Sequence, residues 1–181
     1  MLVPWTAPTQ EAPAWLPVDE LPTEFVRSVQ TAQAKIQSGN PEFQSQALQT
    51  LREQTNVFGP AVVRSATPLL VEVASQQYRI LEFPRSYRVQ PDLRVQAVQL
   101  LGVLGGEAAV TQVADSMLHD PDSSVRGIAA ITLATMRWTE ADYTAVTRAL
   151  RSAHIRRDEL EVRRLLVAVE LLSGNRWLPV P

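Results

Sequence analysis

Cysteine is absent from this chain, which excludes disulfides, thiolate metal sites and cysteine nucleophiles. Histidine is scarce: His119 and His154 are the only two, and their spacing does not make a metal-binding pair. No stretch approaches the roughly eighteen consecutive apolar residues of a transmembrane helix, and the first residues lack the basic and apolar regions of a signal peptide. We therefore expect no metal, no cofactor and no membrane span. We expect a cytoplasmic protein or, alternatively, an exported one whose signal has been removed.

The chain also has little excess charge of either sign. Its 17 basic residues, of which Lys35 is the one lysine, are balanced by 19 acidic residues, and the net charge is −2. No overall positive field draws such a chain to nucleic acid, so we expect a protein partner instead. Aromatic residues make up only 6%, and most apolar side chains are alanine, leucine or valine, which suits close packing of helices.

Two segments of the chain are nearly the same. Residues 91–98 (PDLRVQAV) recur thirty residues later as 121–128 (PDSSVRGI), and each copy opens an apolar run at helical spacing. Similar segments at a period of about 20–50 residues are typical of helical repeat proteins. In such proteins each unit buries its apolar face against the next unit. The repeats therefore predict an all-α fold.

The distribution of proline and glycine divides the chain into three parts. Residues 1–22 hold five prolines and should be extended, residues 23–174 should form a single helical domain, and 175–181 form a short tail. No segment keeps a two-residue alternation, so no sheet is expected. About eight helices are expected, separated by glycine, proline and capping residues: 24–38, 41–58, 60–81 with a kink or restart at Pro68, 92–104, 107–118, 122–136, 140–154 and 159–173.

The repeated segments resemble a known family. Residues 101–110 (LGVLGGEAAV), followed by 117–122 (MLHDPD) and the pair Val125 and Arg126, resemble the HEAT-like repeat of the phycobilin-lyase type. The resemblance covers three stretches, strongly the first and more weakly the other two: 91–136, 41–60 and 159–173. It implies an α-solenoid in which antiparallel helix pairs stack into a curved right-handed superhelix.

The resemblance also assigns a role to one arginine in each repeat. In such repeats this arginine usually bonds an aspartate at the start of the same or an adjacent repeat. Gln96 stands in its place in the copy that begins at residue 91. The resemblance implies two such structural sets: Arg126 with Asp120 or Asp122, and Arg163 with Asp158.

The remaining polar residues form no catalytic constellation. Asp120 and Asp122 are placed where a helix N-terminus favours acidic side chains. The glycines of 102–106 lack the following lysine and the preceding strand of a phosphate-binding loop. We therefore expect no catalytic residue and no enzymatic activity.

Arginines are concentrated at the junction of the last two expected helices. Seven basic or histidine residues fall within seventeen positions there: Arg148, Arg151, His154, Arg156, Arg157, Arg163 and Arg164. Asp158, Glu159 and Glu161 interrupt them, so one interpretation is a solvated and partly paired face. The alternative is a site for an acidic patch of a partner or for phosphate, with Arg148, Arg151, Arg156 and Arg157 as the candidate residues.

A second candidate surface surrounds the loop 83–90. Aromatic and arginine residues alternate along it and on either side of it: Tyr78, Arg79, Phe83, Arg85, Tyr87, Arg88 and Arg94. Tyrosine and arginine are enriched at protein-protein hot spots. They also suit single-stranded nucleic acid, although the net charge argues against that partner. Trp5 and Trp15 in the N-terminal segment would either dock on the protein's own helices or anchor a partner.

The sequence therefore favours a non-catalytic adaptor that binds another protein through its helical surface and the 83–90 loop. Two alternatives stay open. The resemblance allows an accessory protein for bilin attachment or phycobilisome handling. The arginine and tyrosine surfaces allow a HEAT-like nucleic-acid-binding protein. The sequence predicts neither the identity of the partner nor the oligomeric state.

Overall fold

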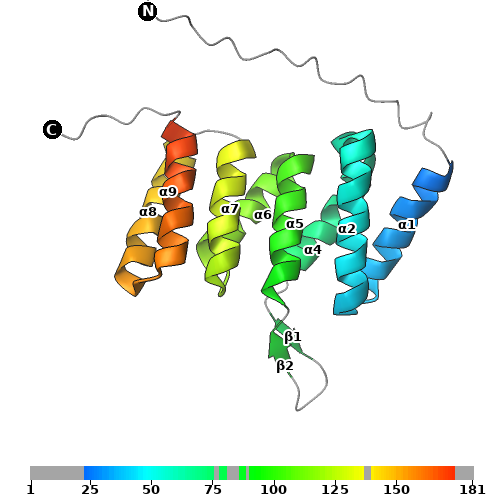
Figure 1. Cartoon of the computed structure of the whole chain (residues 1–181), viewed down its shortest axis with the longest axis horizontal. Helices are drawn as coiled ribbons and strands as arrows, with labels where there is room; N and C mark the ends of the chain where they lie inside the picture. The colour runs from blue at the N-terminus through cyan, green and yellow to red at the C-terminus, as the bar shows by residue number, and fades with distance from the viewer. Residues whose placement is uncertain (1–22, 76–77, 81–85, 89, 137–139, 174–181) are drawn as a thin grey trace, which may run out of the picture.

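The computed structural model describes residues 23–75, 78–80, 86–88, 90–136 and 140–173, which form an all-α array with one small hairpin (Figure 1). The elements follow in the order α1 (Thr23–Gln37), α2 (Pro41–Phe58), α3 (Pro60–Val63), the 3₁₀ turn η2 (Arg64–Ala66), α4 (Thr67–Ser75), β1 (Tyr78–Ile80), β2 (Ser86–Arg88), α5 (Pro91–Leu104), α6 (Glu107–His119), α7 (Ser123–Met136), α8 (Glu140–Arg156) and α9 (Glu159–Ser173). Within these ranges no helix combines the length and the apolar character that crossing a bilayer requires.

The helices lie in two layers. α2, α5, α7 and α9 stand side by side in one layer, while α4, α6 and α8 lie behind them and α1 packs against α2 at one end (Figure 1). Successive long helices run in opposite directions. A continuous apolar core of mostly small and branched side chains fills the space between the layers, including Ala47, Leu51, Leu70, Ala97, Leu101, Val113, Ala129, Leu133 and Leu165. The all-α class expected from the sequence is confirmed.

Local capping explains where the helices begin and end. Asn40 Oδ1 accepts the backbone N–H groups of Glu42 and Phe43 at 2.9 and 3.4 Å, and Pro41 occupies the first helical position of α2. Between α5 and α6 the chain passes through Gly105 and Gly106 at φ of 66° and 89°, a region that glycine adopts without a steric cost. These boundaries agree with those expected from the sequence.

The helix expected over 60–81 differs from the structure in two ways. It is divided into α3, η2 and α4, and the restart falls at Thr67, so that Pro68 lies in the first turn of α4, where its missing N–H group costs no hydrogen bond. The helix also ends at Ser75 rather than at 81.

The expectation that no sheet would form is wrong in one place. β1 and β2 pair antiparallel, with Tyr78 opposite Arg88 and Ile80 opposite Ser86. Strands of three residues are too short to show a two-residue alternation in the sequence, although tyrosine and isoleucine favour extended backbone. The hairpin extends beyond the helices at the edge where the α6–α7 and α8–α9 turns also lie (Figure 1).

The structure corrects the alignment of the two copies. The buried residues Leu93, Ala97 and Leu101 of α5 match Val125, Ala129 and Leu133 of α7 in order and spacing. This register makes Arg94, and not Gln96, the equivalent of Arg126. The physical reason is that the first proline of each motif has a different place: Pro91 lies inside the first turn of α5, whereas Pro121 lies in the turn before α7.

Candidate partner-binding site

A buried ion pair joins α5 to the turn that follows α6. Nε and Nη2 of Arg94 donate to the two carboxylate oxygens of Asp120 at 2.7 and 2.9 Å. The two side chains are 0% and 2% exposed. A buried charge is costly unless it is paired with good geometry, and a bidentate arginine–carboxylate pair provides that geometry. The pair therefore fixes the position of α5 relative to the α6–α7 turn.

The same turn also provides hydrogen-bond acceptors for the N-terminus of α7. Asp120 Oδ1 also accepts the N–H group of Asp122 at 2.8 Å, and Asp122 Oδ1 accepts both the N–H group of Ser124, at 2.8 Å, and the hydroxyl of Ser124. Burial alone would raise the pKa of Asp122. Hydrogen bonds from Ser124 and from the N–H group of Val125, helped by the charge of Arg94, outweigh burial and hold this pKa below its ordinary value.

A second buried carboxylate joins the last three helices. Glu161 of α9 is 1% exposed and accepts Nε and Nη2 of Arg126, from α7, at 2.8 and 2.6 Å. Nη2 of Arg156, from the end of α8, donates to both of its oxygens at 2.9 and 2.8 Å. Burial alone would raise the pKa of Glu161, but the two guanidinium groups outweigh it and keep this pKa below its ordinary value.

The arginine–aspartate pairs that the resemblance implies are not those observed. Nη1 of Arg126 donates to the backbone carbonyl oxygen of Asp120 at 2.7 Å, and its other donors reach Glu161 rather than an aspartate carboxylate. Asp158 Oδ1 accepts the N–H group of Glu161 at 3.0 Å and thereby caps α9. Within the described residues, no hydrogen bond or ion pair links Asp158 to Arg163, which is exposed.

Three buried polar residues have a structural role that the sequence does not predict: Arg94, Glu161 and Gln44. Arg94 is expected from the sequence on the surface around the 83–90 loop, but its pairing with Asp120 buries it. Matching the copies on their prolines aligns Arg94 with a serine. In the sequence, Glu161 is one acid among several that interrupt an arginine-rich stretch. Gln44 of α2 is buried and donates from Nε2 to the carbonyl oxygen of Ile36 at 3.2 Å, and its burial pattern makes it the equivalent of Arg94. Gln44, Arg94 and Arg126 are each the fourth residue of their helix. This shared position is the signal that could identify Gln44 from the sequence.

The arginine-rich junction of α8 and α9 forms a depression beside Glu161 and its partners Arg126 and Arg156. The depression has a volume of about 390 Å³, and residues from α6, α7, α8 and α9 line it: Met117, Leu118, His119, Arg126, Arg148, Ala149, Ser152, Arg156 and Glu161. Among these lining residues Glu161 is the one acid, and two arginines already neutralise its charge. Arg148 is exposed and forms no hydrogen bond or ion pair with a described residue. The depression therefore combines apolar lining residues, Met117, Leu118 and Ala149, with excess positive charge.

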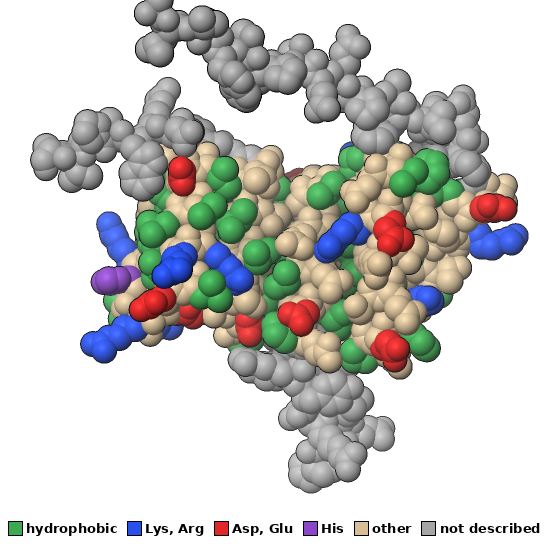
Figure 2. All heavy atoms as spheres, viewed as in Figure 1, with side chains coloured by type: hydrophobic (Ala, Val, Ile, Leu, Met, Phe, Trp, Pro, Cys, Tyr) green, Lys and Arg blue, Asp and Glu red, His purple; other side chains and the backbone are tan. Residues whose placement is uncertain are grey.

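The structure separates the four candidate arginines of the junction. Arg148 and Arg156 line the depression described above, whereas Arg157 lines a second one of about 530 Å³ together with His154, Glu159, Val162 and Arg163. Arg151 lines neither and is exposed on α8. Basic side chains and histidine gather at this α8–α9 end of the molecule (Figure 2).

Arg157 also terminates α8. Its φ is 59°, and it is the one described residue other than glycine in the left-handed region. Its N–H group donates to the carbonyl oxygen of His154 at 3.0 Å, and the next N–H group, of Asp158, donates to Ala153 at 3.1 Å. This pattern is typical of a helix C-terminus closed by a left-handed residue, so Arg157 has a structural role in addition to lining a depression.

The second candidate surface lies partly outside the described residues. Tyr78, Tyr87 and Arg88 are placed in the backbone of the hairpin, at the same edge of the array as the α8–α9 turn (Figure 1). Phe83 and Arg85, and also Trp5 and Trp15, lie outside the described residues. Comparison with known proteins gives no further assignment: no family model, no curated protein and no solved structure matches the chain.

Proposed function

We propose that this chain is a non-catalytic protein-binding module with a HEAT-like helical scaffold, and that the depression at Arg148 and Arg156 receives an acidic segment of another protein. One observation supports this most directly. Guanidinium groups and apolar side chains line the depression together, and the carboxylate that lines it, Glu161, is already paired. An amphipathic acidic segment would complement both its charge and its apolar lining residues.

Rigidity also supports a binding role. Arg126 and Arg156 are held by the buried Glu161 carboxylate, so the wall of the depression is ordered before a partner arrives. A preorganised surface loses less side-chain entropy on association than a mobile one. The pKa of Arg126 is raised, chiefly by its hydrogen bond to Glu161, so its positive charge persists at any physiological pH.

The proposal can be tested with a fluorescently labelled peptide of alternating glutamate and leucine, titrated with the full chain and followed by anisotropy at low salt. Reversing the charge in Arg148→Glu should weaken binding by about tenfold or more, because like charges then face each other across the interface. Arg151→Glu makes the same change on the same helix but outside the depression, and it should change the affinity by no more than about twofold.

Equal losses in the two variants would show that only net charge matters and would reject the site, as would an absence of binding. Inorganic phosphate and a single-stranded oligonucleotide serve as competing probes. If either binds more tightly than the peptide, the acidic-segment proposal is wrong. Thermal melts of each variant check that the fold is intact.

The hairpin is the second part of the proposed surface. It extends from the edge at which the α8–α9 turn lies, so one partner could contact both regions. Reversing Arg85 and Arg88 together should abolish recovery of the native partner in affinity purification from the source organism. If the same partner is recovered with this variant, the hairpin is not part of the interface.

A further inference from the structure

The outward face of α9 carries several large apolar side chains, and no other described element covers them. Four large apolar side chains on it are each about half exposed, namely Leu160, Leu166, Val167 and Leu171, at 53%, 42%, 44% and 47%. Apolar side chains are more frequent over the α7–α9 half of the face shown in Figure 2 than over the α2 half. On α7 the corresponding face is covered by α9. The exposed face of α9 could therefore pack either against a further helix of the same array or against a surface of another kind.

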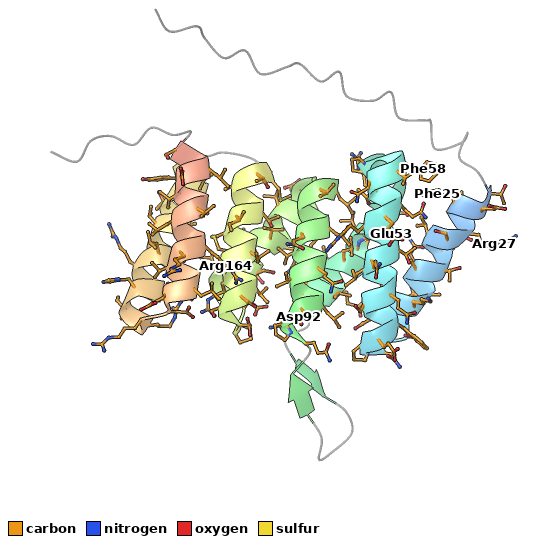
Figure 3. All side chains as sticks on the ribbon, viewed as in Figure 1. Phe25, Arg27, Glu53, Phe58, Asp92 and Arg164 are labelled. Atoms are coloured by element: carbon orange, nitrogen blue, oxygen red, sulfur yellow. The ribbon has the colours of Figure 1, made fainter. Side chains whose placement is uncertain are left out.

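Two glycines show how closely neighbouring helices pack within the layer of α2, α5, α7 and α9. A Cβ atom at Gly102 of α5 would overlap the side chain of Thr132 in α7. A Cβ atom at Gly127 of α7 would overlap the side chain of Arg164, which lies between α9 and α7 (Figure 3). These two positions therefore need the smallest residue because the next helix lies directly over them.

On α9 the two equivalent positions carry charge. The buried residues Val125, Ala129 and Thr132 of α7 match Glu161, Leu165 and Ala168 of α9 in order and spacing. In this register Arg163 takes the place of Gly127, and Glu170 takes the place of Gly102. Arg163 and Glu170 are exposed. These long charged side chains would keep a further helix from packing on α9 as closely as α7 packs on α5 and α9 packs on α7.

The charges of this face are complementary to themselves. Arg163 and Glu170 lie two helical turns apart on the same side, and the midpoint between them falls between Leu166 and Val167. When two copies of α9 run antiparallel about that midpoint, each Arg163 faces the Glu170 of the other copy. The apolar side chains Leu166 and Val167 then meet at the symmetry axis, with Leu160 and Leu171 on either side.

We propose that the uncovered face of α9 is a self-association surface, on which a second copy of this chain packs antiparallel through Leu166 and Val167 and forms two Arg163–Glu170 ion pairs. The contact is one helix face on each side, so its total area lies below the roughly 1,200 Å² at the low end of specific interfaces. The dimer is therefore expected to be weak, to form in the micromolar range of concentration and to dissociate as salt is raised.

Sedimentation equilibrium of the full chain over a wide concentration range tests the proposal. Arg163→Glu alone and Glu170→Arg alone each place two like-charge pairs across the axis and should raise the dimer dissociation constant at least about tenfold. In an equimolar mixture, the two acidic positions of the first variant face the two basic positions of the second. Both ion pairs are then restored, and the mixture should associate as the unmodified chain does. The variant that carries both substitutions should also associate.

Three results would overturn the proposal. The first is an unmodified chain that stays monomeric throughout the range. The second is association that survives in the single variants, or that Arg27→Glu, a control at the opposite end of the array on α1, weakens equally (Figure 3). The third is association that appears only in Trp177→Ala, which would mean that residues 174–181 of the same chain occupy the face.

Discussion

Gln44 of α2 and the arginines of α5 and α7 occupy the same place in their helices but connect different parts of the molecule. Gln44 bonds the carbonyl oxygen of Ile36 near the end of α1, which is its own neighbour in sequence. Arg126 does the equivalent, bonding the carbonyl oxygen of Asp120, and in addition reaches the carboxylate of Glu161 in α9. Arg94 reaches the carboxylate of Asp120 beyond α6.

The fourth position of these helices therefore has two structural functions, depending on whether its side chain is neutral or charged. The neutral side chain closes a single helix pair, whereas the charged side chains also tie one pair to the next. The α2–α5 junction has a weaker polar link, since Arg52 bonds Gln99 between two exposed side chains at 3.2 Å. Stability should therefore be concentrated in the part from α5 to α9 and be lower in α1 and α2.

The strongest test removes the carboxylate that pairs with Arg94. Asp120→Ala leaves the guanidinium group of Arg94 buried without this carboxylate and should lower the free energy of unfolding by about 3–5 kcal/mol, measured by urea denaturation. Asp115→Ala removes an exposed carboxylate from α6 and should change the same quantity by less than about 0.5 kcal/mol. A comparable loss in the two variants would contradict the view that Asp120 ties neighbouring pairs together.

Acidic pH should weaken the α7–α9 end through Glu161. The folded-state pKa of Glu161 lies below the ordinary value of 4.5, so its stabilisation is complete above about pH 4.5 and is lost as the pH falls through the folded-state pKa. Glu161→Gln should cost about 2–3 kcal/mol at neutral pH and make the fall in stability below pH 4.5 shallower. Asp122 and Asp158, whose pKa values are also lowered, account for the slope that remains. Parallel pH curves for the two proteins would show that Glu161 does not carry this effect.

At the other end of the molecule the matching substitution should have a smaller effect. Gln44→Met keeps the volume and loses one neutral hydrogen bond to Ile36, so it should cost about 1 kcal/mol. Arg126→Met removes the equivalent bond and also leaves Glu161 with one arginine, and it should cost at least about twice as much. Equal costs, measured by urea denaturation, would remove the distinction between the two ends.

The smallest expected effect has the opposite sign. Arg157→Gly should stabilise the protein by about 0.5–1 kcal/mol, because glycine adopts the left-handed conformation at φ of 59° without steric cost. The gain would appear as a rise in the thermal midpoint. A drop would mean that the Arg157 side chain contributes more to packing than the backbone conformation costs.

The all-α class and several helix boundaries could be predicted from the sequence because their signals are local. Asn40 with Pro41 sets the start of α2, and Gly105 with Gly106 ends α5, through hydrogen bonds and backbone angles that neighbouring residues determine. The hairpin β1–β2 could not be predicted, since two strands of three residues carry too little pattern.

The pairing of charges could not be predicted because it depends on which helices lie side by side. Arg126 is close in sequence to Asp120 and Asp122, yet its carboxylate partner comes from α9. An alignment on proline conceals Arg94, because that proline falls inside one helix and outside the other. The candidate site could not be predicted for the same reason, because Glu161 of α9 orders Arg126 of α7 and Arg156 of α8 around the depression.

The bond between Arg94 and Asp120 has a consequence for synthesis on the ribosome. When α5 has just left the exit tunnel, the carboxylate that completes its burial is still enclosed, and it emerges only after the whole of α6. α5 therefore cannot reach its final packing until the α6–α7 turn is available. Arg126 of α7 waits in the same way for Glu161 of α9. Gln44 of α2 bonds Ile36, which precedes it, so only the part from α5 onward is completed one step behind its emergence.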